Sequence, residues 1–169
     1  MQLKGVINSR ISKPMRSLHN HLVRICYFRG HGVHSPFVYD LVRQVFMRRE
    51  LLSGDHKLYQ ALREIGVSHH RAIQLQNLAI HCGYQTFSID CAGGDLCIAS
   101  KALSRTELFT LAQEATAQHT TIAVLAPYAD NERQLICRQL ETAHQSTTVD
   151  NRGYLLIFNN HLPKQHFRI

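Results

Sequence analysis

The sequence predicts an α/β fold in which a helical N-terminal region is followed by a mostly parallel sheet with an antiparallel C-terminal edge. Apolar residues recur every three or four positions in the first half, as in amphipathic helices. Later, short apolar runs alternate with helical periods. The last two runs flank residues 150–153, a composition suited to a tight turn. We expect a basic helical region over 1–66 and an α/β domain over 67–169.

Local signals place the helices of this fold. Ser35 is a suitable N-cap and Pro36 suits the first helical position, so a helix begins there and continues to about residue 50. Ser68 is a plausible N-cap for a helix that stops at Gly83. Ser104 and Glu107 have capping-box spacing. The remaining helices are expected at about 16–28 and 56–65 and, after an Asp130 cap, through Leu140 and Ala143.

The strands are expected at 86–90, 95–99, 121–126, about 146–150 and about 153–159. The first two are separated only by residues 91–94. A parallel crossover ordinarily needs at least ten to twelve residues. Either these two strands are not parallel neighbours, or the units that normally lie between them are absent from this chain.

Charge is distributed unevenly along the 169 residues. Residues 1–71 hold 12 Lys/Arg against 4 Asp/Glu, whereas residues 72–169 hold 7 against 8. Such a basic region either contacts a polyanion or is a solvated helical surface. Residues 1–50 are therefore a candidate nucleic-acid contact. No apolar run approaches the ~20 residues of a membrane span, and none resembles a secretory signal, so we expect a cytoplasmic protein without a membrane segment.

The most specific motif is Gly30-His31-Gly32-Val33-His34-Ser35-Pro36-Phe37-Val38-Tyr39. It resembles the N-terminal signature of a group of bacterial proteins, known chiefly from Bacteroidetes, that are class I S-adenosylmethionine-dependent methyltransferases or their relatives. Residues 68–72 and 153–167 also look like this group. The resemblance implies that residues 67–169 form a reduced Rossmann-like domain of the methyltransferase type after a short basic helical region, with S-adenosylmethionine as the cofactor if the protein is active.

The resemblance also suggests cofactor-binding residues. Asp90 stands in the place of the acidic residue of the first cofactor motif, and Gly93 and Gly94 would supply its turn. Ala92 stands where a glycine is usual, and a lone Gly-Gly after a strand is more often simply a turn. The acidic residue that would bind the ribose hydroxyls has no counterpart between Gly94 and the next strand.

Catalytic groups are also missing from the sequence pattern. Relatives that look catalytic carry an acidic cluster after the strand that ends here near Ile98. This chain instead has residues 99–102, Ala-Ser-Lys-Ala, and after the following strand residues 126–128, Ala-Pro-Tyr. Without carboxylates there is no obvious metal site or general base, so no catalytic residue is assigned.

The histidines and cysteines offer little further chemistry. His31 and His34 supply two ligands where a zinc site needs three or four, so we expect no metal and assign these rings to hydrogen bonds in loops. Five cysteines, an odd number without C-x-x-C spacing, argue against a disulfide framework or a zinc ribbon. Cys91 could be a nucleophile beside a histidine, but we expect a buried, inert thiol.

Three functions remain open. The first is a reduced methyltransferase-like protein that has lost catalysis, or retains it only weakly, and acts by binding a partner or as half of an oligomer. The second is an active methyltransferase with an unorthodox pocket that uses Asp90, Gly93 and Gly94. The third is a nucleic-acid-binding module in which the basic helices of residues 1–50 lie along phosphates.

Overall fold

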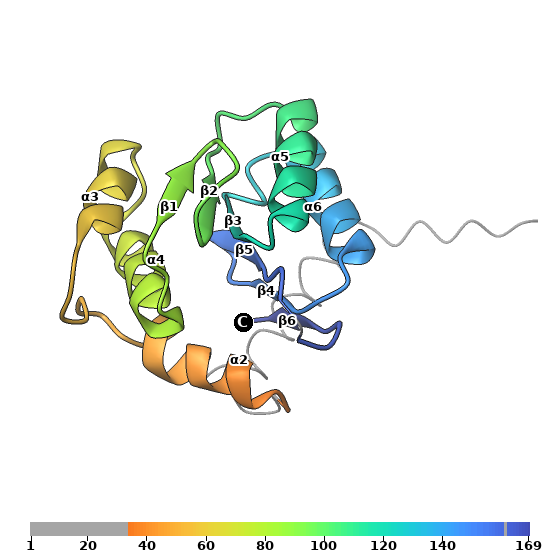
Figure 1. Ribbon diagram of the computed structural model, residues 1–169. Helices are drawn as coiled ribbons and strands as arrows, with labels where there is room; N and C mark the ends of the chain where they lie inside the picture. The colour runs from red at the N-terminus through yellow and green to blue at the C-terminus, as the bar shows by residue number, and fades with distance from the viewer. Residues whose placement is uncertain (1–33, 161) are drawn as a thin grey trace, which may run out of the picture.

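The computed structural model describes residues 34–160 and 162–169, so the helix predicted at 16–28 and His31 lie outside the described part of the chain. A central sheet lies between two layers of helices (Figure 1). The helices are α2 (Pro36–Leu41), the π-helix η2 (Val42–Phe46), α3 (Lys57–Glu64), α4 (His69–Cys82), α5 (Arg105–Ala117) and α6 (Asn131–Ala143). The strands are β1 (Phe87–Ile89), β2 (Leu96–Ala99), β3 (Thr121–Leu125), β4 (Thr148–Asp150), β5 (Tyr154–Ile157) and β6 (His166–Arg168).

Within the described residues the sheet has six strands in the order β1-β2-β3-β5-β4-β6. The pairs β1–β2, β2–β3 and β4–β6 are parallel, and β5 runs antiparallel to both β3 and β4. The predicted fold class is therefore confirmed: a Rossmann-like, mostly parallel sheet with its antiparallel part on the C-terminal side. The edge strand β6 was not predicted, because its three residues, His-Phe-Arg, show no apolar run.

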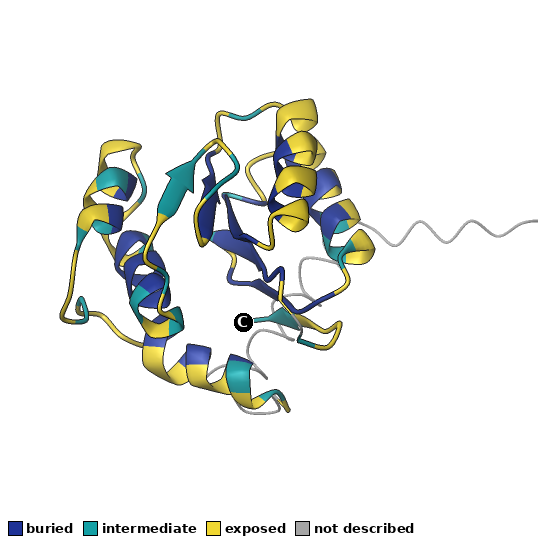
Figure 2. Cartoon of the chain, viewed as in Figure 1, coloured by how far each residue is buried: buried dark blue, intermediate teal, exposed yellow. Residues whose placement is uncertain are grey.

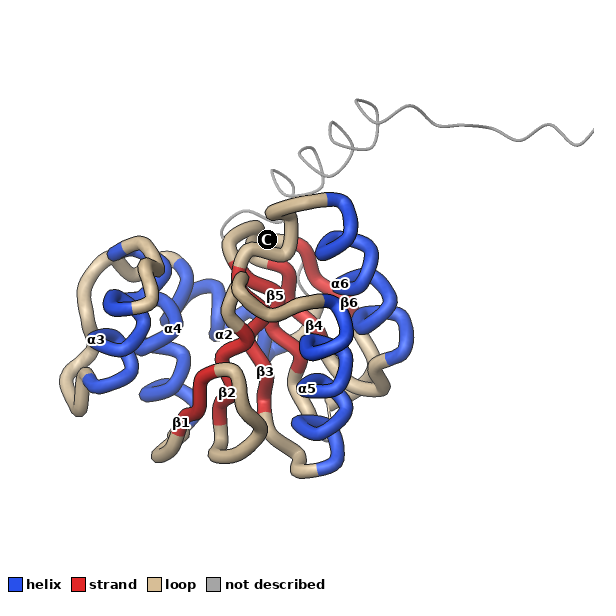
Figure 3. Tube along the Cα trace, turned by 90° about the horizontal axis from the view of Figure 1, so that it is seen from above, coloured by secondary structure: helices blue, strands red, loops and turns tan. Residues whose placement is uncertain are grey.

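The two faces of the sheet bury different helices. Because side chains alternate along a strand, Leu96 and Ile98 of β2 face α2, η2, α3 and α4, while Cys97 and Ala99 face α5 and α6. Figure 3 shows the two helical layers on opposite sides of the strands. Burial follows the same arrangement, since β2 to β5 are buried throughout, α5 and α6 are buried on their inner sides, and residues 72–79 of α4 are buried all round (Figure 2).

The helix after Pro36 begins as predicted but ends earlier. Ser35 Oγ accepts a hydrogen bond from the Val38 amide, and Pro36 occupies the first turn. The backbone then widens into η2 and leaves the helix at Met47, not near residue 50. Side chains of α4 hold the chain beyond this point: Gln74 Nε2 donates to the Phe46 carbonyl, and Asn77 bonds to the Glu50 carbonyl and the Leu52 amide.

Other helix ends also agree with their local signals. Ser104 and Glu107 form both bonds of the capping box, and Asp130 accepts from the Arg133 amide. Gly83 ends α4 in the left-handed conformation. Ser68 occupies the N-cap position of α4 without a side-chain capping bond.

The first two strands are parallel neighbours despite their short connection, so the alternative that they do not pair is wrong. Phe87 pairs with Leu96 and Ile89 with Ile98. The connection can be short because β1 has only three residues, roughly 10 Å of extended chain. Residues 90–95 retrace that distance without a crossover helix.

The predicted boundary at residue 66 falls in the turn between α3 and α4. Side chains from both sides of it share one core, in which Leu41 and Leu62 pack with Leu75 and strand residues. In the described part of the chain, no helix is long and apolar enough to cross a lipid bilayer.

Candidate functional site

The residues predicted to bind a cofactor lie at opposite edges of the sheet. Asp90 follows the carboxyl end of β1, and its amide donates to the carbonyl of Ile98. Gly94 lies at the amino edge, where its carbonyl accepts from the Thr120 hydroxyl. Gly93 lies between Asp90 and Gly94 along this loop, and its carbonyl accepts a hydrogen bond from Ser88 Oγ. The loop therefore runs back along the sheet and does not form a glycine-rich turn at the carboxyl edge.

Gly94 has a structural role in this loop. It adopts φ +72°, and a Cβ added there would lie 3.0 Å from Thr86 Oγ1 and 3.2 Å from the Thr86 carbonyl carbon and oxygen. The next residue, Asp95, accepts hydrogen bonds through its carboxylate from the amides of Gln85 and Thr86. These bonds lower the pKa of Asp95 below its usual range. Gly94 thus allows its own segment to approach the backbone of Thr86 closely.

The Asp90 carboxylate has a partner within the chain. Its Oδ1 accepts a hydrogen bond of 2.6 Å from the amide of Ser100, the first residue after β2. Asp90 itself adopts a positive φ of 56°, which turns the chain away from β1. This bond to a backbone amide occupies part of the hydrogen-bonding capacity of the carboxylate.

Arg133 binds backbone carbonyls at the carboxyl edge of the sheet, next to the loop of Asp90. Its guanidinium donates to the carbonyls of Ser100 (2.7 Å), Leu125 (3.1 Å) and Leu103 (3.3 Å), residues at or beyond the ends of β2 and β3. This role was not predicted from the sequence. A signal was present, because Arg133 falls in the same helical register as the apolar residues Ile136, Cys137 and Leu140 of α6, which is the buried face.

A buried polar cluster occupies the same edge on the other face of the sheet. Arg71 of α4 donates to Asn151 and Gln74, and its guanidinium lies 5.6 Å from the ring centroid of Tyr154. Tyr154 is fully buried, donates to Gln74 Oε1 and accepts from Asn151 Nδ2. Gly153 lies against this cluster, and a Cβ there would displace the end of the Arg71 side chain, because it would lie 2.9 Å from Arg71 Cδ and Cζ.

The other residues singled out in the sequence do not converge. His34 is exposed, His69 Nδ1 bonds to the Tyr59 hydroxyl, and His70 Nε2 lies 3.1 Å from Gln74 Nε2. Among the described residues no three His, Cys, Asp or Glu side chains come together as a metal site. The expectation of a buried Cys91 is wrong: it is exposed, because the returning loop lies outside the sheet.

The remaining described cysteines are free thiols at least partly inside the protein. Cys97 and Cys137 are buried against α5 and α6, and Cys82 is half-buried. Burial raises the pKa of Cys97 to about 11 and that of Cys137 to about 12. Thiols with such values are protonated near neutral pH and are poor nucleophiles.

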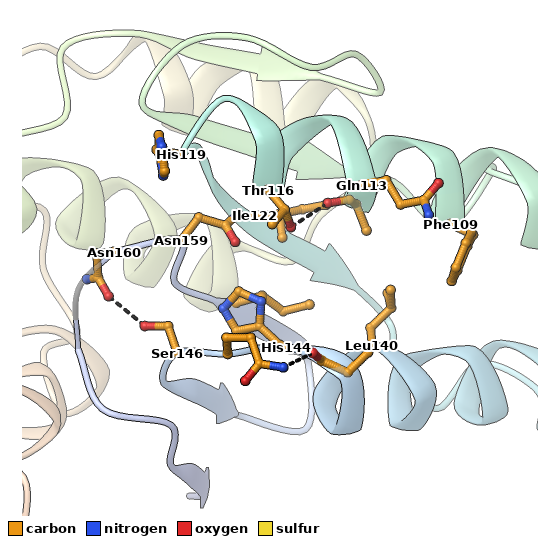
Figure 4. A pocket seen from close by; sticks show the side chains of 14 residues that line it. Phe109, Gln113, Thr116, His119, Ile122, Leu140, His144, Ser146, Asn159 and Asn160 are labelled. Atoms are coloured by element: carbon orange, nitrogen blue, oxygen red, sulfur yellow. Dashed lines mark hydrogen bonds between the residues drawn. The ribbon is translucent and has the colours of Figure 1, made fainter.

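A cavity of about 450 Å³ lies away from the predicted site, between α5 and α6. Figure 4 shows Phe109 and Leu140 at one end and a group of polar side chains at the other. The lining residues are Phe109, Ala112, Gln113, Thr116, His119, Ile122, Leu140, Ala143, His144, Gln145, Ser146, Ile157, Asn159 and Asn160. Its polar end is at the amino edge, since His119 precedes β3 and Ser146 precedes β4.

A smaller cavity of about 190 Å³ lies between the N-termini of α5 and α6, at the carboxyl edge. Its lining includes Lys101, Arg105, Asp130 and Arg133. Neither this cavity nor the larger one is lined by the residues predicted to bind the cofactor.

Comparisons of the chain with protein-family models, with curated proteins and with solved structures give no significant match. The resemblance to methyltransferases therefore depends on the sequence motifs alone. The structure adds a Rossmann-like sheet, which many unrelated functions share.

Proposed function

We propose that this chain is a methyltransferase-like protein that has lost methyl transfer, or retains it only weakly, and that acts by binding a partner. The observation that carries the proposal is the Asp90 carboxylate. It is bonded to the Ser100 amide, while Gly94, which the cofactor turn would need beside it, lies at the opposite edge. In open α/β sheets, ligands bind beyond the carboxyl ends of the strands, at the edge where Asp90 lies.

Further contacts along that edge support the proposal. Arg133 binds three backbone carbonyls beyond β2 and β3. The Tyr128 hydroxyl donates to the carboxylate of Asp150 at the end of β4. Arg71 donates to Asn151. Each of these polar groups would have to exchange an internal partner for a nucleoside, which lowers the net free energy of binding.

Titration calorimetry with S-adenosylmethionine tests the proposal. We expect no saturable heat with the wild-type protein and the same result with Asp90→Ala. Tight binding by the wild type that Asp90→Ala abolishes would contradict the proposal and favour the active methyltransferase with an unorthodox pocket. Circular dichroism of both proteins checks that the variant is folded.

The partner-binding half of the proposal is tested separately. Sedimentation analysis over a concentration series distinguishes a second copy of the chain from a different protein. A mass that rises with concentration identifies a homo-oligomer. A constant monomer mass directs the search to another macromolecule.

Nucleic acid is a second candidate partner, because exposed basic and aromatic side chains lie near one another in the sequence of α2, η2 and the residues that follow. Arg43, Arg48 and Arg49 are exposed on and just after η2, and Tyr39 of α2 is 42% exposed. Arginine and aromatic side chains together bind single strands through phosphates and base stacking. We expect binding to a mixed oligonucleotide to weaken steeply as salt increases. Fluorescence anisotropy that stays unchanged at low ionic strength would exclude this candidate.

A further inference from the structure

The cavity between α5 and α6 combines an apolar body with a polar end. Its lining contains no Asp, Glu, Lys or Arg side chain. Burial lowers the pKa of His144, whose Nε2 lies 2.6 Å from the Phe158 carbonyl, so this ring is neutral near pH 7. A volume of about 450 Å³ is typical of small-molecule sites, which are mostly apolar with a few fixed polar groups. This lining disfavours ions and favours a neutral ligand.

One polar group in the cavity wall lacks a partner. Asn159 is only 7% exposed, and its Oδ1 is the one buried side-chain polar atom in the described residues without a hydrogen bond. The amide orientation is fixed, because Nδ2 donates to the Thr120 carbonyl, which can only accept. Oδ1 is therefore an acceptor. A buried acceptor without a donor is destabilising, and a ligand that supplies a donor relieves that cost.

We propose that this cavity binds a small, uncharged, largely apolar molecule that donates one N–H or O–H hydrogen bond to Asn159 Oδ1. The apolar part of the ligand lies between Phe109 and Leu140, and the donor lies at the end near His119 and Ser146 (Figure 4). The inference does not rest on the proposed loss of methyl transfer, because the cavity is not lined by Asp90 or the two glycines.

Indole and 1-methylindole are a matched pair of probes for this site. Both are neutral bicyclic fluorophores, but only indole has an N–H donor. The chain contains no Trp, so excitation at wavelengths specific for indole reports on the probe alone. We expect a saturable blue shift with indole and roughly fivefold weaker binding of 1-methylindole. If burial of apolar surface alone determined affinity, 1-methylindole would bind more tightly than indole, because its methyl group adds apolar surface.

Two threonine variants locate the binding. Thr116 lines the cavity from α5, and Thr142 of α6 does not; each hydroxyl donates to the carbonyl four residues earlier. Thr116→Phe fills part of the cavity and should weaken indole binding roughly tenfold or more, whereas Thr142→Phe should leave it unchanged. Thermal unfolding of both variants verifies that they fold.

Each outcome decides the proposal. Indole binding that exceeds that of 1-methylindole and is lost in Thr116→Phe supports it. An absence of saturable indole binding overturns it. Equal or tighter binding of 1-methylindole also overturns it, because Asn159 Oδ1 would then have no ligand donor and would be left to water. Binding that survives Thr116→Phe places the probe elsewhere and also overturns it. Calorimetry with S-adenosylmethionine remains a separate measurement, so failure of one proposal is distinguishable from failure of the other.

Discussion

At the scale of single residues, Gly94 and Gly83 separate two reasons for a glycine. Both adopt φ +72°, but a Cβ on Gly94 would meet Thr86 at 3.0–3.2 Å, whereas a Cβ on Gly83 would meet nothing within 4 Å. Backbone strain is therefore common to both positions. Only Gly94 adds the close approach on which the short β1–β2 connection depends.

The two alanine variants measure this difference. We expect Gly83→Ala to lower the free energy of unfolding by about 1 kcal/mol, the usual cost of a left-handed non-glycine residue. Gly94→Ala should cost about 2–3 kcal/mol, because the steric contact adds to the strain. Chemical denaturation of both variants checks the values. Equal losses would show that the Thr86 contact is unimportant.

At the scale of the element, α4 and α6 show that polar side chains of a helix can organise the surrounding chain. Gln74, Gln76 and Asn77 of α4 are all buried, and each bonds to backbone groups of the segment between residues 46 and 59. The backbone of that segment makes few hydrogen bonds to other backbone groups, so side chains of α4 supply the missing partners. At the end of α6, His144 similarly binds the Phe158 carbonyl.

Burial of His144 predicts a pH dependence. Burial lowers its pKa in the folded protein, and Lys164 lowers it further, despite the opposing effect of the Phe158 carbonyl. The unfolded chain therefore binds more protons below the ordinary histidine pKa near 6.5, and stability falls as the pH drops through that range. One proton gives a slope of at most about 1.4 kcal/mol per pH unit.

Denaturation of His144→Gln at a series of pH values between neutral and pH 5 tests the assignment. The slope should become smaller than in the wild type but should not vanish, because burial also lowers the pKa of His70 and His166. His119→Gln, on the exposed opposite side of the cavity, is the control. An unchanged slope in His144→Gln would contradict the prediction.

At the scale of the whole molecule, the N-terminal helices and the sheet share a core. Val38 and Leu41 of α2 are fully buried in the same cluster as Leu62, Leu96 and Leu156. Phe37 also contacts Phe158 edge to face, with ring centroids 5.1 Å apart. Residues on both sides of position 66 should therefore unfold together.

Leu41→Ala tests this cooperativity. The lost burial and the resulting cavity should lower the free energy of unfolding by about 2–5 kcal/mol and shift one common transition. Leu135→Ala, at a position 51% exposed, should change it by less than about 0.5 kcal/mol. Circular dichroism and tyrosine fluorescence should give coincident curves. Two transitions, with the N-terminal helices unfolding first, would contradict a shared unit.

Local chemistry made much of the fold predictable from the sequence. The caps at Ser35, Ser104 and Asp130 and the stop at Gly83 involve neighbours within about four residues, so sequence spacing reveals them. Short apolar runs likewise indicated the buried strands β2 to β5. The strand β6 escaped detection because it is a partly exposed edge strand with one apolar residue among its three.

The sequence by itself determined where helices and strands form, because those preferences depend on nearby residues. Only the tertiary structure decided at which edge of the sheet the candidate cavity lies and which polar side-chain atoms lack a hydrogen-bond partner. Asp90 meets Ser100, Arg133 meets Leu103, and Asn159 meets Thr120 across 10, 30 and 39 residues of chain. The hydrogen-bonding capacity of each side chain depends on partners that folding brings together, which is why the candidate cavity appeared only in three dimensions.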